Sequence, residues 1–259
     1  MSDSADRYYQ TLAADYARTI RQLVPRYDEM LETIAALVRV PAGHSPPGPP
    51  SPVPAPSGRG TADDRSVLDI GAGSGEVSAL LLSRHPGMRI TAIEPSTAMR
   101  EVLRPRLAPW ADRVRIEPAD ALGFAPGHRC DVVVTNLVLH NLGNRDKRKA
   151  LRRILNTLVA GGVFVWGDMI LRPDARVQRD VIADRTRHAR AAGCPEAFIA
   201  ENFRKEAEDD SPWTIHETLL ALRRVGFRDV DCVWSAGGFA VFAVRRPGRK
   251  GRQESESLR

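Results

Sequence analysis

The feature that most constrains this chain is a short apolar stretch that runs directly into a glycine-rich turn. Residues 66–70 are apolar enough for a buried strand, and the turn Gly-Ala-Gly-Ser-Gly at 71–75 leads into a helical segment at 75–84. Glycine is needed there because a Cβ would hold a ligand away from the backbone, and because the turn can require positive φ. A ligand is therefore expected at the carboxyl end of this strand.

Strand-like and helix-like stretches alternate along most of the remaining chain, which favours a parallel sheet covered by helices on both faces. The last two strands are joined by Ser-Ala-Gly-Gly at 235–238, a hairpin connection, so the final strand should run antiparallel. We expect a three-layer α/β fold with a seven-stranded sheet. The predicted strands are 66–70, 89–93, 113–117, 131–135, 163–166, 230–234 and 239–244, and the predicted helices are 75–84, 97–107, 146–158 and 214–225.

Three segments depart from this alternation. Residues 41–60 hold eight prolines and four glycines, and proline removes amide donors and fixes φ, which predicts an extended linker. Residues 1–40 show helical apolar spacing broken near Pro25, and residues 172–210 show mixed-charge helical spacing without a strand. We expect residues 1–40 to form a helical lid. Residues 172–210 should form a substrate-cap insertion within a ligand-binding domain at 61–245.

The formal net charge of +6 is unevenly distributed. The tail from Arg245 onward holds six basic residues against two acidic ones, so it carries +4 of the total and leaves +2 for the rest of the chain. Such a tail is typical of a solvated, disordered end at 246–259, and the other interpretation is an arm that binds nucleic acid. Because the folded part carries no strong phosphate-binding charge, nucleic acid is not expected as a partner.

Composition also bears on location and metal content. No apolar stretch approaches the roughly 18 residues of a membrane span, and residues 1–6 do not resemble a secretory signal. Cys130, Cys194 and Cys232 form no CxxC pair, which fits a reducing cytoplasm and argues against a structural zinc site. We expect a cytoplasmic protein with no membrane span and no metal, and leave a homodimer open.

The spacing of the glycines separates two classes of ligand. A dinucleotide fingerprint GxGxxG beginning at Gly71 would need a sixth-position glycine, where the chain has Glu76. The arrangement D-x-G-x-G-x-G from Asp69 instead resembles the loop that binds S-adenosyl-L-methionine (SAM) in class I, Rossmann-like methyltransferases. That resemblance implies their fold, with SAM as the cofactor.

Three further residues stand where that family places cofactor contacts. Glu94 ends the second strand and can accept hydrogen bonds from both ribose hydroxyls. Asp120 follows the third strand near the adenine amine, and Asn136 ends the fourth beside the methionine part of SAM. The other interpretation makes Glu94 and Asp120 solvated turn acids and Asn136 a strand-end cap. The resemblance assigns these residues to the cofactor: Tyr27, Asp69, Gly71, Ala72, Gly73, Glu94, Pro95, Met99, Asp120, Ala121 and Asn136.

Within this class, residues 21–27, 92–99 and 216–239 look like the carboxy-SAM synthase group, which acts in tRNA wobble-uridine modification, and equally like plain methyltransferases close to it. In that group the tyrosine matching Tyr27 contacts SAM, whereas without the resemblance Tyr27 indicates helix packing. The group holds an extra carboxylate with an arginine. When this chain is aligned with that group without a gap, Phe203 stands at the position of the arginine, and a phenylalanine cannot pair with a carboxylate. A gap of one residue in the alignment would place Arg204 at that position.

His140 follows the fourth strand at the rim of the predicted pocket, where its ordinary pKa suits removal of a proton. The other interpretation is a helix-start residue that bonds to the backbone. We expect SAM-dependent methyl transfer to a small molecule, with Phe203 shaping an apolar pocket roofed by Tyr8, Tyr9 and Tyr16. The alternatives are a carboxy-SAM synthase-like enzyme that modifies SAM, and a non-methylating SAM-binding protein or cyclase.

Overall fold

The computed structural model describes residues 13–38, 65–125 and 129–248. The predicted linker at 41–60, the roof residues Tyr8 and Tyr9, and residues 249–259 of the predicted tail lie outside the described residues.

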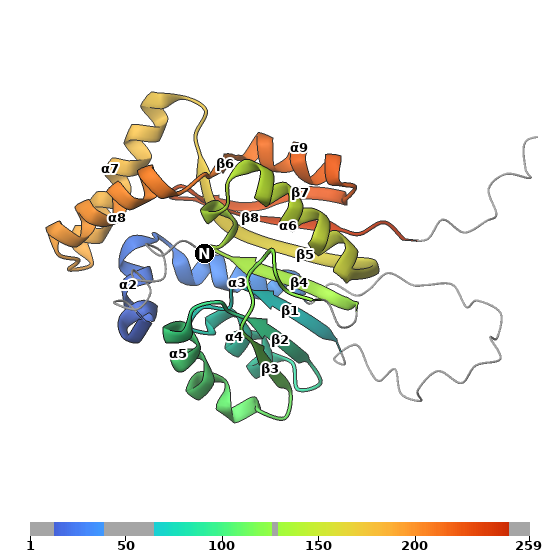
Figure 1. Ribbon diagram of the computed structural model, residues 1–259. Helices are drawn as coiled ribbons and strands as arrows, with labels where there is room; N and C mark the ends of the chain where they lie inside the picture. The colour runs from blue at the N-terminus through green and yellow to red at the C-terminus, as the bar shows by residue number, and fades with distance from the viewer. Residues whose placement is uncertain (1–12, 39–64, 126–128, 249–259) are drawn as a thin grey trace, which may run out of the picture.

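A seven-stranded sheet in the order β3-β2-β1-β4-β5-β8-β7 forms the middle layer (Figure 1). The strand β8 runs antiparallel to both of its neighbours, and the other neighbouring pairs are parallel. This confirms the predicted sheet, to which a two-residue strand, β6, adds a parallel pairing with β5. The strands are β1 (Ser66–Ile70), β2 (Arg89–Ile93), β3 (Val114–Glu117), β4 (Cys130–Asn136), β5 (Leu158–Leu171), β6 (Trp213–Thr214), β7 (Arg228–Ala236) and β8 (Phe239–Arg245).

Two hydrophobic cores lie on the two faces of the sheet. One is formed with α3 (Tyr27–Val38), α4 (Glu76–Arg84) and α5 (Thr97–Leu107), and the other with α6 (Asn144–Thr157) and α9 (Ile215–Val225). Side chains alternate along β4, so Val132 and Val134 enter the first core and Val133 the second. All three valines are buried, which explains why this strand is apolar on both sides.

The helix predicted at 146–158 is α6, which ends at Thr157. The strand predicted at 163–166 begins earlier, so Gly161 and Gly162 lie inside β5. Leu158 pairs with Cys130 of β4 and is fully buried. Backbone hydrogen bonds then join Gly161 and Gly162 to Arg246 at 3.1 and 2.8 Å, so strand pairing, rather than a helix cap, fixes these glycines.

The N-terminal helix and the predicted insertion lie together at the left of Figure 1. The helix α2 (Tyr16–Leu23), which follows η1 (Ala13–Asp15), packs beside α7 (Ala175–Ala191), and α8 (Glu196–Asp209) follows. Gln22 Nε2 donates to Ala192 O at 2.9 Å, and His188 Nε2 lies 2.9 Å from Arg21 O. These contacts join segments that lie some 170 residues apart in the chain.

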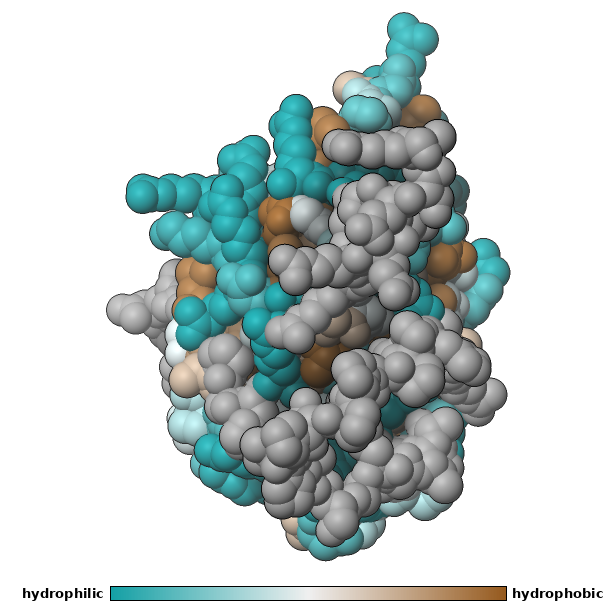
Figure 2. Space-filling model, turned by 90° about the vertical axis from the view of Figure 1, so that its right-hand side faces the viewer, coloured by the Kyte–Doolittle hydropathy of each residue, from teal (hydrophilic) through white to brown (hydrophobic). Residues whose placement is uncertain are grey.

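The remaining short helices are η2 (Ala108–Trp110) and η3 (Leu139–Asn141). Among the described residues, no helix combines the length and apolar character needed to cross a membrane. Figure 2 shows a face on which the described side chains are mostly hydrophilic, with apolar atoms in small separate patches.

Candidate active site

The turn between β1 and α4 takes the backbone conformation that its glycines allow. Gly71, Gly73 and Gly75 have φ values of +69°, +55° and +85°, a region that residues with a Cβ rarely adopt. A Cβ on Gly71 would collide with the side chain of Val138, whereas a Cβ on Gly73 would meet nothing closer than the Met99 methyl group at 3.5 Å. The loop therefore keeps one side open at Gly73.

A cavity of about 410 Å³, here called the larger cavity, lies against this loop. It collects residues from the ends of β1, β2 and β4 and from the turn after β3, as the rule for parallel sheets predicts. Eight of the residues assigned from the sequence line it: Gly71, Gly73, Glu94, Pro95, Met99, Asp120, Ala121 and Asn136.

The three other assigned residues do not line this cavity. Tyr27 is buried in the core, where its hydroxyl bonds the Glu76 carboxylate and burial raises its pKa. Asp69 Oδ2 accepts a hydrogen bond from Ser78 Oγ at 2.6 Å, and burial raises the pKa of Asp69 to about 7. Ala72 is also buried. Asp69 therefore ties β1 to α4, and Tyr27 packs as a helix residue, while Tyr16 of α2 reaches the cavity instead.

Glu94 is buried rather than solvated, with 6% of its surface exposed. Its Oε2 accepts from the Gly73 amide at 2.8 Å and its Oε1 from the Ser96 amide at 2.9 Å. Burial raises its pKa, and these two amides partly offset that effect. Because each carboxylate oxygen has two lone-pair sites, both can still accept a hydrogen bond from a ligand hydroxyl.

Asn136 and Asp120 differ in how their polar atoms are used. Asn136 Oδ1 is buried and accepts no hydrogen bond from any residue in the described ranges. Asp120 Oδ1 accepts from the amides of Leu122 and Gly123 at 2.9 and 2.6 Å, which stabilises the turn after β3. Asn136 Oδ1 lies over Gly167, beside the side chains of Met30 and Ile34, so its assignment to the cofactor stays a prediction.

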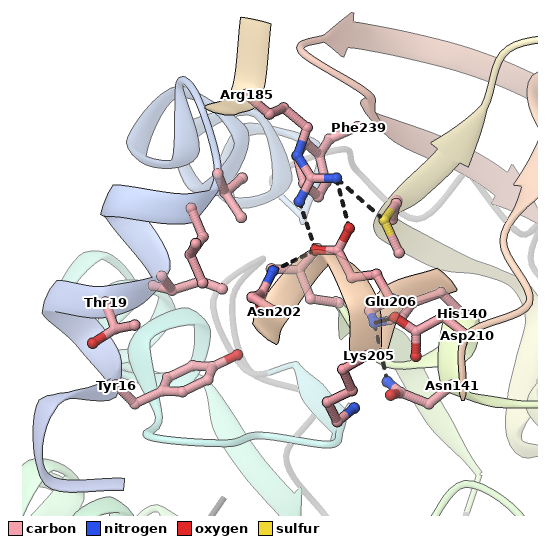
Figure 3. Close-up of a pocket in the computed structure, with 15 residues that line it drawn as sticks. Tyr16, Thr19, His140, Asn141, Arg185, Asn202, Lys205, Glu206, Asp210 and Phe239 are labelled. Carbon is pink, nitrogen blue, oxygen red and sulfur yellow. Dashed lines mark hydrogen bonds and ion pairs between the residues drawn. The ribbon is translucent and has the colours of Figure 1, made fainter. Parts of the chain in front are cut away.

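A second cavity of about 70 Å³, the smaller cavity, adjoins the first (Figure 3). The two cavities share Tyr16, Leu137, Asn141 and Lys205 in their walls. Figure 3 shows Tyr16 and Thr19 of α2 on one side of the smaller cavity and His140, Asn141 and Asp210 on the other.

His140 lies in the wall of the smaller cavity with 12% of its side chain exposed. Its Nδ1 bonds Asp168 Oδ1, and its backbone amide donates to Asp168 Oδ2 at 3.0 Å. Asp168 is held in turn by Trp166 Nε1 at 2.7 Å. His140 Nε2 lies 3.1 Å from Asn141 Nδ2 and 3.8 Å from Asp210 Oδ2. The side chain therefore bonds a carboxylate, so its interpretation as a residue that bonds the backbone was wrong.

The charges around His140 determine its proton affinity. Burial lowers the pKa of His140, but the carboxylates of Asp168, Asp210 and Glu206 together outweigh burial and raise it above its ordinary value. An ionised Asp168 requires Nδ1 to carry the proton, so the Nε2 lone pair of the neutral ring accepts from Asn141 Nδ2 at 3.1 Å and would have to exchange that donor for a substrate hydroxyl. The pair therefore has the arrangement of a histidine base oriented by a carboxylate.

Sequence reasoning missed Asp168 and Asp210. Asp168 interrupts the apolar run of β5 near its carboxyl end. A lone charged residue at the end of an apolar strand could have indicated a functional side chain. Asp210 follows α8, and nothing in its local pattern pointed to His140, which lies seventy residues earlier.

The positions of Phe203 and Arg204 also differ from expectation. Phe203 lines neither cavity. It packs against the cluster of Leu23, Ala189 and Ile199, with the Arg185 guanidinium 4.8 Å from its ring centre. Arg204 is exposed and pairs with surface carboxylates on its own helix. The expectation that Phe203 shapes the acceptor pocket was therefore wrong, because α8 turns that side chain toward α2 and α7.

Comparison with known proteins agrees with this architecture. Residues 68–164 match the family of methyltransferase domains. An uncharacterized methyltransferase of Bacillus licheniformis is 33% identical over 172 residues, which cover 65% of this chain and 74% of that protein. A carboxy-S-adenosyl-L-methionine synthase of Nautilia profundicola is 20% identical over 184 residues, which cover 70% of this chain and 77% of that protein.

Among solved structures, an O-methyltransferase family protein from Burkholderia thailandensis has the same fold, with a TM-score of 0.60 at 17% identity. The alignment covers 96% of this chain but 60% of that one, so this chain spans less than two thirds of the larger protein. The chain belongs to the class I, Rossmann-like SAM-dependent methyltransferases.

SAM is the cofactor of this family, and the larger cavity suits it on two observations. Gly73 leaves space where a side chain would stand. Glu94 presents a buried carboxylate with lone pairs to spare, suited to a pair of hydroxyls.

Proposed function

We propose that this protein methylates a hydroxyl group of a small molecule, with SAM in the larger cavity and the acceptor in the smaller one. The observation that carries the proposal is the His140–Asp168 pair, because it lies in the wall of a cavity that adjoins the larger one. Gly73, Glu94, Asp120 and Asn136 would hold the cofactor.

A base is useful only for some acceptors. A carboxylic acid is already ionised near neutral pH and needs no proton removed, whereas a hydroxyl group must lose its proton as it attacks. SAM, when bound, supplies a methyl group already activated by a sulfonium. His140 Nε2 would take the hydroxyl proton, and the Asp168 carboxylate would stabilise the imidazolium that results. The dyad therefore favours a hydroxyl acceptor over a carboxylate.

The helices around the smaller cavity support a small acceptor. Tyr16, Thr19 and Ile20 of α2 close one wall, and Lys205 and Glu206 of α8 close another. A site enclosed in this way orients the acceptor and excludes water, which are the main contributions a protein can make when the donor is already activated.

The carboxy-SAM synthase alternative needs a cation that grips a second carboxylate. Arg204, the residue that a one-position gap would supply, is exposed and paired with Glu201 and Glu208. A SAM-binding scaffold would have no use for a buried histidine–carboxylate pair, whereas a cyclase could use it as a base. Carboxy-SAM synthesis would have to use Lys205, the cation in the shared wall of the two cavities, and transfer of a labelled methyl group separates methyl transfer from both alternatives.

The test uses methyl-labelled SAM and a low-molecular-weight metabolite extract, with label transfer and S-adenosylhomocysteine (SAH) formation as readouts. Removal of a general base lowers the rate by roughly 100-fold to 10,000-fold, so His140→Ala should lose transfer while its affinity for SAH, measured by calorimetry, stays within twofold. The control is His216→Ala, which changes an exposed histidine on α9. Full transfer by His140→Ala would contradict the proposed base.

A further inference from the structure

The smaller cavity contains a buried carboxylate with an unused oxygen. Asp210 follows α8, and its side chain is 4% exposed. Its Oδ1 is buried and accepts no hydrogen bond from any residue that the structure describes. Leaving a buried charged acceptor without a donor is unfavourable, so the fold tolerates this arrangement at some cost.

Asp210 is fixed in place by the residues beside it. The Ser211 amide donates to His140 O at 2.7 Å, and Lys147 Nζ donates to Ser211 O. Two residues further on, Trp213 Nε1 donates to Asn144 Oδ1 at 2.6 Å. The carboxylate therefore lies on a segment held from both η3 and α6, and its open oxygen is a built feature of the cavity.

The second carboxylate in this wall is already occupied. Arg185 donates to both oxygens of Glu206, at 2.7 and 2.8 Å, and Asn202 Nδ2 donates to Oε1 at 2.8 Å. Of these two carboxylates, Asp210 is thus the one with an oxygen that lacks a donor within the described residues. Its other oxygen lies 3.8 Å from His140 Nε2.

We propose that Asp210 binds a second hydrogen-bond donor on the acceptor, a hydroxyl or amine on the carbon next to the one whose hydroxyl is methylated. This deepens the proposed function and rests on it, because His140 Nε2 marks where the reacting hydroxyl lies. A group on the adjacent carbon then reaches Asp210. The wall contains the apolar side chains of Leu137, Met169 and Phe239 as well as polar ones such as Asn202 and Lys205, so an apolar carbon skeleton has a surface to pack against. The substrate class is an apolar compound, such as a small aromatic, with two adjacent donors.

The experiment measures binding, without chemistry, to the full chain saturated with SAH. The probes are catechol, 2-aminophenol and phenol, which offer an adjacent hydroxyl, an adjacent amine and no second donor. A hydrogen bond to a buried charge corresponds to about a tenfold or larger difference in affinity. Calorimetry should therefore show catechol or 2-aminophenol binding at least about tenfold tighter than phenol, and the tighter of the two identifies the donor.

Variants show whether Asp210 binds the second donor of the acceptor or only positions His140. In Asp210→Ala the three probes should bind equally, with phenol unaffected, and the Glu201→Gln control, on the surface of α8, should keep the preference. Equal binding of the three probes by the wild-type protein, or binding of none, would overturn the inference. A loss in Asp210→Ala that phenol shares equally would assign Asp210 to positioning His140 and would also overturn it. A binding preference without any methyl transfer would contradict the proposed function alone.

Discussion

The larger cavity and the smaller one beside it are made from different parts of the chain. The larger cavity takes most of its wall from strand ends and turns between residues 71 and 142, whereas the smaller cavity combines α2, η3, β5, α7, α8 and β8. Backbone conformation matters most in the first, because Gly71 and Gly73 adopt positive φ. Buried side-chain charges matter most in the second. A change in one region should therefore leave the function of the other intact.

The largest effect should come from the smaller cavity. Asp168→Asn removes the carboxylate that orients His140 and stabilises its charged form, so kcat should fall by roughly 100-fold to 10,000-fold. The affinity for SAH should stay within twofold, since Asp168 does not line the larger cavity. Steady-state kinetics and calorimetry check the two parts. Asp229→Asn, at an exposed carboxylate, is the control, and a variant that loses cofactor affinity as much as rate would break the separation of the two regions.

The next effect belongs to the larger cavity. Gly73→Val combines strain at positive φ with a side chain in the space left for the ligand, so SAH affinity should fall by at least about 100-fold. Gly161→Val is the matched control, because Gly161 also has positive φ, at +78°, but a Cβ there meets nothing within 4 Å. If calorimetry shows equal losses for both variants, backbone strain, and not occupation of the cavity, explains the effect.

The same contrast explains how far the sequence could predict this molecule. The seven strands and the antiparallel last strand follow from local patterns, and the eight residues of the larger cavity were assigned through resemblance at strand ends and turns with a recognisable spacing. The pairing of His140 with Asp168 depends on η3 folding back over the end of β5, and no local pattern encodes that contact. Tyr27 was assigned through resemblance, and here α3 packs it into the core beside Glu76.

A moderate loss of cofactor affinity is expected when the contact to the ribose of the cofactor is removed. Glu94→Ala removes the carboxylate that directly follows β2, and cofactor binding should weaken by about 1–3 kcal/mol, the scale of a lost charge-assisted hydrogen bond. Calorimetry with SAM and with a 2′,3′-dideoxy analogue isolates the contact, because the analogue lacks both hydroxyls. If the wild-type protein binds the two equally, Glu94 does not hold the ribose.

The pH dependence of the rate tests the electrostatics of the acceptor region. Since Asp168 and the other carboxylates raise the pKa of His140, the rate should increase with pH as His140 loses its proton, with a midpoint above the ordinary histidine value. Removing the negative charge in Asp168→Asn lowers that pKa, so the residual activity should rise at lower pH. A profile of kcat/KM against pH that is identical in both proteins would assign the titration to another group.

The smallest effect is expected on the surface of α8. Arg204 is exposed and makes surface ion pairs, so Arg204→Ala should leave both the melting temperature and methyl transfer nearly unchanged. The wild-type protein given SAM and prephenate should yield no carboxy-SAM by mass spectrometry. A prephenate-dependent mass increase on SAM that Arg204→Ala abolishes would contradict both the methyl-transfer proposal and the role of the smaller cavity.

The most direct test of two adjoining cavities with separate tasks is a crystal structure of the protein with SAH. We expect the ribose hydroxyls at Glu94, the amino group at Asn136, and the sulfur at the shared wall formed by Leu137 and Asn141, facing the smaller cavity and His140. SAH bound outside the larger cavity, or with its sulfur directed away from His140, would contradict this assignment.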